Sequence, residues 1–409
     1  MAKLLILSQV FLPDPASVGQ HIADVAFEMA RRGHEVVVYT ADRGYEDPTV
    51  RFLRRETMEG VDVRRLPFSS FGKKSIPVRI LGTALFMGQA FAVTLVEPGV
   101  RGMLFSTSPP LIGFVASLAG ALRNVPGAYW AMDLNPDQLL ALGKIKPNSA
   151  PALFLETINR FVLRRAKLVV ALDRFMADRL RPRAPGLDDK MRVMPPWPHE
   201  DHLAPVDQQT NPFRIAHDLV GKRVIMYSGN HSPSNPLTTV LEAAVRFKDD
   251  PRVVFAFVGG GLGKKEVEAT IAAHGLKNAI SLPYQPLADL RFSLSAGDVH
   301  VVSLGGDMVG IIHPCKVYGA MAASRPVLFF GPRPSHVSDL LDHHGFGWHV
   351  DHGDVEGAVR AIDEILRTPQ EKLAAMGEAG RAALDGGLSQ KQICGALCDE
   401  LEGMMMQGG

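Results

Sequence analysis

One segment of the chain has the composition of an anion-binding turn. Residues 305–332 read GGDMVGIIHPCKVYGAMAASRPVLFFGP, between an expected strand at Val299–Leu304 and another at Val327–Phe330. Glycine lets backbone N–H groups come close to a ligand, and the N-terminus of a helix carries partial positive charge. A helix is expected from about Pro314, so Lys316 would add a full charge in its first turn. The pattern predicts a phosphate site, with an ordinary strand-to-helix turn as the alternative. The residues expected to contact the ligand are Gly310, His313, Lys316 and Val317.

Two further glycine turns are expected in the second half of the chain. YSGNHSPSNP follows an expected strand at Arg223–Ser228, and VGGGLGKK ends another. Gly229 and Asn230 can present backbone and amide donors to a diphosphate, and Gly260 lies where the base or ribose of a nucleotide would fit. The second turn lacks the spacing and the Ser or Thr of a P-loop. Its lysine pair is equally well explained as solvated charges in a first helical turn.

Acidic groups follow an expected strand at Ala128–Met132, in YWAMDLNPDQLLALG. A carboxylate at the carboxyl end of a strand can bind a substrate hydroxyl or take its proton. Asp133 is therefore a predicted catalytic residue, together with Lys316. Asn135 and Asp137 are predicted to contact the acceptor of a transfer reaction. The alternative is a polar cap before a helix.

The loop FLPDPASVGQH follows the first expected strand. Gly19 lies where that strand is followed by a helix, so its N–H group can face a phosphate or a transferred group. His21 is predicted to contact the acceptor. The alternative is a plain turn in which Ser17 caps the helix. The loop contains no G-x-G-x-x-G pattern, which argues against a dinucleotide cofactor.

Strand and helix patterns alternate along both halves of the chain. A strand at Lys3–Ser8 is followed by a helix at Val18–Arg32, and the same alternation resumes after a Pro-rich linker at residues 195–212. Strands that alternate with helices predict parallel sheets covered on both faces. The predicted fold class is α/β, with two tandem Rossmann-like doubly wound domains whose strand ends face a central cleft. The expected parts are residues 1–200, residues 201–385, and a C-terminal helix at 386–409 that packs back toward the first domain.

Composition narrows the class of protein. The 409 residues are too many for one typical core, and 46% hydrophobic with 21% charged residues is an ordinary globular balance. A net charge of +1 gives no global field to attract nucleic acid, so no nucleic-acid partner is expected. Three cysteines are too few for a disulfide framework and lack a metal-site pattern, which fits a reducing cytoplasm and predicts no metal.

Two features point to a membrane surface. Ile80–Val96 is a run of 17 uncharged residues, at the lower limit for a membrane span, and is expected to form a buried or membrane-surface helix. Basic clusters next to apolar helices are typical of proteins that bind anionic membranes, with ordinary solvated helix faces as the alternative. These basic residues are Lys73, Lys74, Arg79, Arg164, Arg165 and Lys167.

Together these residues resemble the GT-B glycosyltransferases, specifically the retaining family-four group and, within it, the transferases of bacterial lipopolysaccharide, capsule and exopolysaccharide assembly. FLPDPASVGQH resembles the N-terminal glycine loop of the family, and DLNPD resembles its D-L-W-P-E stretch. YSGNHSPSN resembles the Y-x-G-N loop, and HPCKVYGAMAASRPVL resembles the P-S-K-x-Y-E-x-x-A-x-G-x-P-V motif. The resemblance covers nearly the whole chain.

The resemblance implies an activity. The expected enzyme moves a sugar, with retention, from a nucleotide-diphosphate sugar to a lipid-linked or cell-surface polysaccharide precursor. A UDP-sugar is the expected donor, held by the C-terminal domain, while the N-terminal domain binds the acceptor. No cofactor or metal is implied. The expected location is the cytoplasm, with peripheral contact to the inner face of the cytoplasmic membrane.

Four positions depart from the family pattern. Asn230 and Asn235 stand where many members have an Arg and a Lys, so part of the diphosphate neutralisation is missing. Gly319 stands where the motif glutamate usually holds the donor ribose, and Ser324 replaces the motif glycine. Two alternatives follow: a sugar-nucleotide epimerase on the same fold, and a non-catalytic scaffold that binds sugar nucleotides.

Overall fold

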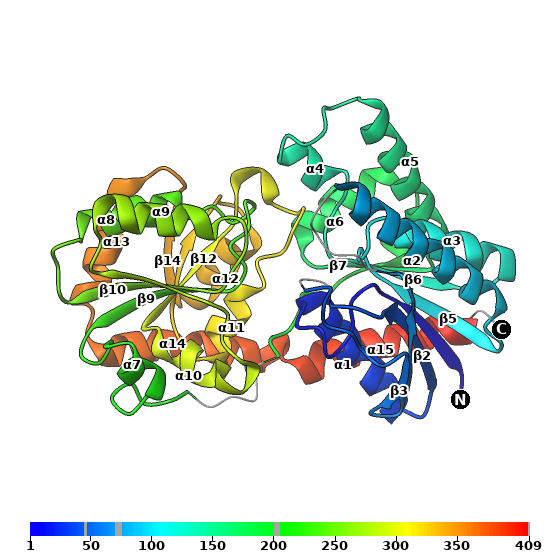
Figure 1. Ribbon diagram of the computed structural model, residues 1–409, viewed down its shortest axis with the longest axis horizontal. Helices are drawn as coiled ribbons and strands as arrows, with labels where there is room; N and C mark the ends of the chain where they lie inside the picture. The colour runs from blue at the N-terminus through cyan, green and yellow to red at the C-terminus, as the bar shows by residue number, and fades with distance from the viewer. Residues whose placement is uncertain (45–46, 70–75, 200–204, 408–409) are drawn as a thin grey trace. The chain divides into compact units, whose positions relative to one another are not determined.

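Two β-sheets organise the chain, and each belongs to its own compact unit (Figure 1). The computed structural model describes residues 1–44, 47–69, 76–199 and 205–407. Unit 1 consists of Met1–Pro196, Gly310–Ile312 and Lys391–Gly409, and unit 2 consists of Trp197–Val309 and His313–Gln390. The predicted α/β class with two Rossmann-like domains is confirmed.

The unit 1 sheet has eight strands in the order β3-β4-β2-β1-β5-β6-β7-β8. Every neighbouring pair is parallel except β3 with β4. The bounds are β1 Lys3–Leu7, β2 Glu35–Ala41, β3 Arg55–Met58, β4 Val61–Leu66, β5 Val100–Phe105, β6 Gly127–Ala131, β7 Leu168–Ala171 and β8 Met191–Val193. The edge strand β3 was not predicted, because RETM is short, polar and only partly buried. It forms by pairing antiparallel with β4 across a tight turn, and the sequence of β3 has no apolar pattern that would predict this pairing.

Strand β1 lies inside the unit 1 sheet, between β2 and β5. Its residues Leu4, Leu5, Ile6 and Leu7 are fully buried. A strand covered on both faces needs a continuous apolar run rather than an alternating one, which is the pattern of KLLIL. The run therefore is a central strand, as the sequence predicts.

Helices cover both faces of the unit 1 sheet (Figure 1). Helices α2, α3 and α5 pack together on one face, and α1 lies with α15 on the other. The bounds are α1 Ser17–Arg31, α2 Ile76–Val96, α3 Ile112–Arg123, α4 Asp137–Ala141, α5 Ala150–Arg165, α6 Arg174–Leu180, η1 Arg181–Arg183, η2 Asp188–Lys190 and α15 Gln390–Gln407. In the described part of the chain, no helix has both the length and the apolar character that crossing a membrane requires.

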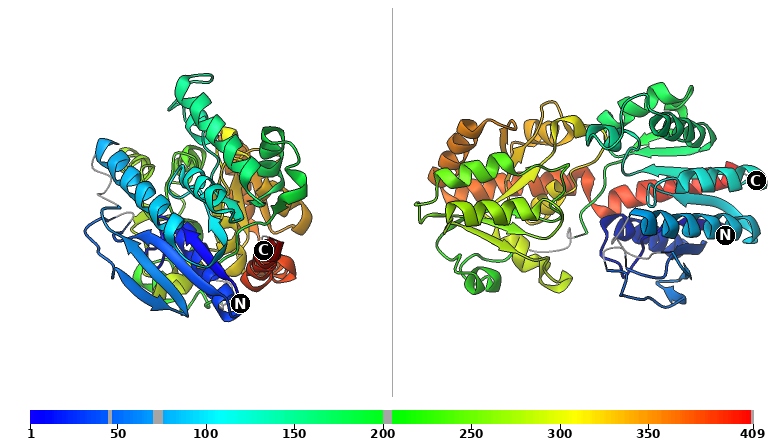
Figure 2. Two further views of the ribbon diagram at one scale, coloured as in Figure 1. Left: turned by 90° about the vertical axis from the view of Figure 1, so that its right-hand side faces the viewer. Right: turned by 45° about the horizontal axis from the view of Figure 1, so that its top comes forward.

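The C-terminal helix α15 is fixed to unit 1 by ionic contacts (Figure 2, in red). The Arg32 guanidinium, just after α1, donates to Asp399 at 2.6 Å and to Glu402 at 3.1 Å. The His34 Nε2 atom lies 2.8 Å from a second oxygen of Glu402. Buried apolar residues of α15, such as Leu397 and Leu401, complete the contact. The last helix of the chain thus returns to the unit in which the chain begins.

The unit 2 sheet has six parallel strands in the order β11-β10-β9-β12-β13-β14. The strand bounds are β9 Arg223–Ser228, β10 Val253–Val258, β11 Ala279–Leu282, β12 Val299–Ser303, β13 Val327–Phe330 and β14 Gly347–Val350. The helix bounds are α7 Pro212–Ala216, α8 Thr238–Arg246, α9 Lys264–His274, η3 Leu287–Asp289, α10 Leu290–Ala296, η4 Gly306–Met308, α11 Lys316–Ala322, α12 His336–His344, α13 Val355–Arg367, α14 Gln370–Ala383 and the π-turn η5 Leu384–Leu388.

Unit 2 has a separate core on each face of its sheet. One core joins β9 and β10 to α8 and α13, and includes Phe255 and Ile362. The other lies under α7 and α10, and includes Phe213 and Ala296. Helix α7 begins at Pro212, the last residue of the segment that the sequence predicts as a linker. It forms because Asn211 caps its N-terminus and Phe213 enters this second core.

A buried ion pair ties α7 to the unit 2 sheet. The carboxylate of Asp298 lies 2.6 Å from the Arg214 guanidinium, and both side chains are almost fully buried. The same carboxylate accepts hydrogen bonds from the backbone N–H of Val224 at 2.6 Å and from the Gln208 amide at 2.7 Å. Asp298 thus holds Arg214, Gln208 and the start of β9 together inside unit 2.

We expect Asp298→Ala to destabilise the protein by about 3–5 kcal/mol, because the buried Arg214 charge would lose its partner. Asp249, which is exposed after α8, provides the control, and Asp249→Ala is expected to change stability by less than about 0.5 kcal/mol. Urea unfolding of both variants measures the difference. Equal stabilities would show that the ion pair contributes nothing to the fold.

Candidate active site

The first polar loop of unit 1 follows β1. The Ser8 hydroxyl donates to the Val10 carbonyl at 2.8 Å, which holds the chain as it leaves the strand. Gly19 lies in the first turn of α1, where a Cβ atom would be only 3.1 Å from the backbone nitrogen of Phe11. Glycine at this position lets the helix pack on the loop. The predicted donor contact of Gly19 stays a prediction beside this packing role.

His21 is buried where α1 meets the end of β6. Its Nδ1 atom lies 2.8 Å from the Ser17 carbonyl, so this nitrogen carries the proton and donates it. Its ring meets the Trp130 ring edge to face, with 6.3 Å between the centroids. Trp130 belongs to β6, only three residues before Asp133. The fold therefore brings His21 to the strand that positions the predicted catalytic carboxylate.

Asp133 has the properties of a general base. It follows β6, is half-buried, and its backbone N–H donates to the Thr107 hydroxyl at 3.2 Å. Among the described residues, no protein group hydrogen-bonds its carboxylate. Burial raises the pKa of this carboxyl group to about 6. Such a group is ionised at neutral pH and basic enough to take a proton from a hydroxyl group.

The two acceptor-binding candidates after Asp133 differ in their surroundings. Asn135 is half-buried just before α4. Asp137 is the first residue of α4, and one of its carboxylate oxygens lies 2.5 Å from the Arg183 guanidinium. That ion pair joins α4 to the segment after α6. Asp137 is thus engaged within unit 1, and its contact with an acceptor stays a prediction.

Gly310 lies in unit 1, although the segments on either side of it belong to unit 2. It has φ of +69°, and a Cβ atom there would be 2.5 Å from the Phe175 carbonyl oxygen. The neighbouring Ile311 carbonyl accepts a hydrogen bond from the backbone N–H of Leu134 at 2.9 Å. This contact places residue 311 beside the Asp133 loop.

In unit 2, the turns after β9 and β10 pack backbone against backbone. Gly229 has φ of +126° and Gly259 has φ of +128°. A Cβ atom on Gly259 would be 2.0 Å from the Gly229 carbonyl oxygen, so no side chain fits between them. The backbone N–H of His231 also donates to the Gly260 carbonyl at 2.7 Å. The structure therefore brings the predicted donor residues Gly229, Asn230 and Gly260 to one edge of the sheet.

His231 connects these two turns. Its Nδ1 atom lies 3.1 Å from the Gly229 carbonyl oxygen, which can only accept, so Nδ1 carries the proton. The residue is fully buried, and burial lowers the pKa of its imidazole, so the ring is neutral at pH 7. Its other nitrogen, Nε2, has no hydrogen-bond partner in the described residues. Sequence reasoning did not select this residue, because a single histidine in a loop is a weak signal.

Lys316 is an unpaired cation above these turns. It is half-buried at the start of α11, and a Cβ atom on Gly229 would lie 2.8 Å from its Cε atom. Its ammonium group lies 5.2 Å from the centroid of the Tyr227 ring, within range of a cation–π contact. No acidic side chain of the described residues pairs with it. Burial lowers the pKa of the ammonium to about 8, which still leaves it charged at pH 7.

Helix α11 contributes less to the attraction of an anion than the sequence suggests. Helix α11 begins at Lys316 rather than near Pro314 and has only seven residues, so the lysine charge is the main attraction for an anion. The Val317 side chain is buried in the core and its backbone N–H donates to the Pro314 carbonyl at 3.2 Å. Its predicted donor contact is untested.

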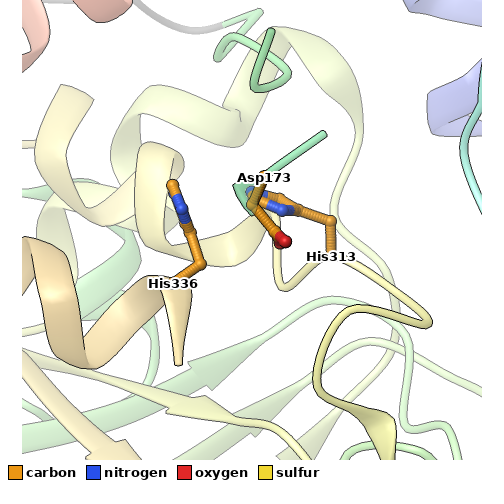
Figure 3. Close-up of side chains that lie close together, drawn as sticks. All are labelled: Asp173, His313 and His336. Carbon is orange, nitrogen blue, oxygen red and sulfur yellow. The ribbon is translucent and has the colours of Figure 1, made fainter. Parts of the chain in front are cut away.

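His313 is fixed by two residues that the sequence did not indicate. Its Nε2 atom lies 2.9 Å from the Tyr318 hydroxyl oxygen, which lies 2.8 Å from Nε2 of His336. Figure 3 shows the two imidazoles, one from the loop before α11 and one from the start of α12. Their ring centroids lie 4.4 Å apart. The Tyr318 hydroxyl has one proton, so it donates to one of these ring nitrogens and accepts a hydrogen bond from the other, which carries its own proton.

Tyr284 is a further residue that sequence reasoning missed. It follows β11, its side chain is 58% exposed, and a Cβ atom on Gly260 would lie 2.9 Å from its ring. An exposed aromatic ring beside a glycine turn offers a flat surface for a nucleotide base. The available signal was an aromatic residue directly after a predicted strand.

The four residues that differ from the family motif lie in different surroundings. Asn230 is exposed and Asn235 is buried, so only the first could meet a ligand directly. A Cβ atom on Gly319 would meet nothing within 4 Å, so the missing glutamate leaves open space. Ser324 has φ of +51°, the left-handed conformation that the motif glycine adopts without strain.

Comparisons with known proteins bear on the fold and the class of protein. The sequence matches the glycosyl transferase 4-like domain over residues 17–197 and glycosyl transferases group 1 over residues 209–383. It is 27% identical over 401 residues to the probable glycosyltransferase WbjE of Pseudomonas aeruginosa, covering 95% of each chain. It is 26% identical over 401 residues to WcaI of Escherichia coli strain K12, a putative colanic acid biosynthesis glycosyl transferase, covering 93% of this chain and 96% of that one.

A solved structure shares the fold. Anabaena HepE, in complex with UDP-glucose, matches with a TM-score of 0.71 at 16% identity, covering 98% of this chain and all of that chain. Identity this low establishes the fold alone. The two matched domains correspond to the two sheets described above.

The contact between the two glycine turns gives a test of the site. We expect Gly259→Ala to destabilise the protein by about 2–5 kcal/mol, because the new methyl group meets the Gly229 carbonyl in a conformation that favours glycine. Gly306→Ala is the control, since nothing lies within 4 Å of its Cβ position. Thermal unfolding of both variants makes the comparison, and a Gly259→Ala protein as stable as the control would contradict the packing argument.

Proposed function

The chain belongs to the GT-B glycosyltransferases and is an enzyme of the hexosyltransferase type, and we propose that it transfers a sugar from a UDP-sugar to a lipid-linked or cell-surface polysaccharide precursor. The observation that carries the donor half of this proposal is Lys316, a half-buried ammonium without an acidic partner above the Gly229 and Gly259 turns. A buried unpaired charge is costly unless a ligand neutralises it. A diphosphate supplies that charge.

The donor is proposed to bind unit 2 as follows. The Lys316 ammonium meets the diphosphate, and the glycine turns allow the phosphates to approach the backbone. The Tyr284 ring stacks on the base. The leaving diphosphate gains charge as the glycosidic bond breaks, so a fixed cation at this place accelerates the reaction. Support for UDP comes from HepE, whose structure contains UDP-glucose.

The acceptor is proposed to bind unit 1. Asp133 takes the proton of the attacking hydroxyl group, and Asn135 with His21 orients the acceptor. Retention of configuration is proposed through attack on the same face of the sugar from which the diphosphate leaves. The printed names of WcaI and WbjE, one in colanic acid biosynthesis and both glycosyltransferases, support a glycan acceptor. They also favour a transferase over an epimerase or a scaffold.

The location is proposed to be the cytoplasm, with peripheral contact to the inner face of the membrane that carries the lipid-linked acceptor. Support comes from the three free cysteines, which fit a reducing compartment. Peripheral contact would give the enzyme access to an acceptor whose lipid stays in the bilayer.

The first test is nucleotide binding and its pH dependence. We expect UDP to raise the unfolding temperature more than GDP, ADP or TDP, since a ligand that binds the native state stabilises it. Because the pKa of Lys316 is lowered to about 8, UDP affinity measured by calorimetry should fall about tenfold between pH 7 and pH 9 as the ammonium loses its proton.

Two variants isolate the lysine in this test. Lys316→Arg keeps its charge throughout this pH range and should remove the decline, whereas Lys316→Ala should weaken UDP binding about tenfold or more at pH 7. If no nucleotide shifts the unfolding temperature, the proposed donor class is wrong. Unchanged binding by Lys316→Ala would remove only the role of this residue.

The second test addresses the proposed base. Turnover of the UDP-sugar should fall as the pH decreases through about 6, because the pKa of Asp133 is raised to about 6 and only its ionised form accepts a proton. Asp133→Asn should lower kcat by about 10²–10⁴-fold. Asp218→Asn, at an exposed position in unit 2, is the control and should leave both the rate and its pH profile unchanged. An Asp133→Asn enzyme with the wild-type acid limb would exclude Asp133 as the base.

A further inference from the structure

The peptide that joins Gly229 to Asn230 is held in one orientation by a buried imidazole ring. The Nδ1–H group of His231 donates to the Gly229 carbonyl at 3.1 Å, and the His231 side chain is fully buried. The C=O and N–H groups of a trans peptide point in opposite directions, so the N–H group of Asn230 points away from this ring. Asn230 is exposed, and its N–H group donates to no acceptor among the described residues. This turn therefore presents a free backbone donor on its exposed side.

A lysine holds the next glycine turn in the same way. The Lys264 ammonium donates to the Gly259 carbonyl at 2.6 Å and to the Leu282 carbonyl at 2.5 Å. The alternative of a solvated charge is therefore wrong for Lys264. The peptide after Gly259 directs the Gly260 N–H group away from the lysine, and in the part of the chain that the structure describes nothing accepts a hydrogen bond from it. The second turn thus presents a free backbone donor as well.

Different groups of unit 2 lie beside the two free N–H groups. A Cβ atom on Gly229 would be 3.6 Å from the Lys316 Nζ atom, so the Asn230 N–H group lies close to this ammonium. A Cβ atom on Gly260 would be 2.9 Å from the Tyr284 ring. A cation with a backbone donor suits a diphosphate. An aromatic ring with a backbone donor suits a nucleoside, whose base stacks and whose oxygen atoms accept hydrogen bonds.

Glycine leaves these orientations free to change unless a side chain fixes them. Gly229 and Gly259 have φ of +126° and +128°, and glycine has more conformational freedom than any other residue. A peptide that rotated by half a turn would point its carbonyl oxygen, which carries partial negative charge, at the diphosphate. A hydrogen bond to each carbonyl therefore keeps the N–H group on the side of the ligand.

We propose that His231 and Lys264 are positioning residues of the donor site. Each holds the carbonyl of a glycine turn, so that the following N–H group meets the bound nucleotide. The Asn230 N–H group binds the diphosphate beside Lys316, and the Gly260 N–H group binds an oxygen atom of the nucleoside. The inference rests on the proposed function, in which unit 2 binds a UDP-sugar, and it adds two residues that act on the donor through the backbone.

The test measures the binding of UDP and of its two parts, pyrophosphate and uridine, by calorimetry at pH 7. His231→Leu removes the Nδ1–H group and keeps a side chain of similar size. It should weaken the binding of UDP and pyrophosphate about fivefold or more and leave uridine binding within about twofold of wild type. His231→Asn should restore both affinities, because its amide nitrogen is as many bonds from the backbone as Nδ1 of histidine and can donate to the same carbonyl.

Lys264→Met should give the complementary pattern, because it frees the Gly259 carbonyl and leaves the Gly229 peptide in place. We expect it to weaken the binding of UDP and uridine about fivefold or more, with pyrophosphate binding within about twofold of wild type. Lys264→Arg keeps donors for both carbonyls and should bind all three ligands as wild type does. Lys265→Met is the matched control, since it removes the same charge from an exposed neighbour and should change each affinity by less than about twofold.

The pattern of losses separates positioning from other roles. Equal loss of UDP, pyrophosphate and uridine binding in a variant would assign that residue to the stability of the fold and overturn its positioning role. Wild-type affinities in His231→Leu and Lys264→Met would overturn the inference and leave the proposed donor site intact. A wild-type protein that binds none of the three ligands would overturn the proposed donor site, and the inference with it.

Discussion

Parallel pairing of the strands is the constraint on which both units depend. Parallel strands all end at the same edge of a sheet, and every connection must cross back over a face, which requires helices on both sides. Strands β1 and β9 lie inside their sheets and are buried along most of their length. The loops that leave β1, β6, β9, β10 and β12 carry the candidate residues. The candidate residues are therefore gathered at the carboxyl ends of these strands.

Burial shifts the pKa values of two groups that carry opposite charges. It raises the pKa of the Asp133 carboxyl group to about 6 and lowers the pKa of the Lys316 ammonium to about 8. Both groups remain charged at neutral pH, and neither has an ionic partner among the described residues. By contrast, Asp298 and Asp137 are buried or nearly buried acids that each pair with an arginine. Ionisable groups without an ionic partner therefore mark the places where a ligand can interact with a charge. The paired groups stabilise the fold.

Tight packing and exposed apolar surface occur in different parts of the molecule. At the unit 2 glycine turns, no Cβ atom fits between Gly259 and the Gly229 carbonyl, so the backbone itself forms the surface that a ligand meets. On α2, large apolar side chains stand exposed on a helix whose other face is fully packed. The first arrangement suits a small anionic ligand, and the second suits an extended apolar partner. The proposal that unit 2 binds the donor follows from the first arrangement.

The sequence by itself determined the fold class and the central elements, because long apolar runs and helical periodicity are local signals that survive in any context. It also indicated Asp133, Lys316 and the glycine turns, since these lie next to strands that can be recognised. Strand β3 and helix α7 were not predicted because RETM and PFRIA are short: β3 forms by pairing with the strand that follows it, and α7 forms by packing on a core built from distant residues. Tertiary structure alone decided that Asp137 pairs with Arg183, that Tyr318 links His313 to His336, and that the Tyr284 ring stands beside Gly260. The His313–Tyr318 pair is local, but the other contacts join residues 18 or more positions apart, so their existence depends on how the strands align, and no local pattern of residues records that alignment.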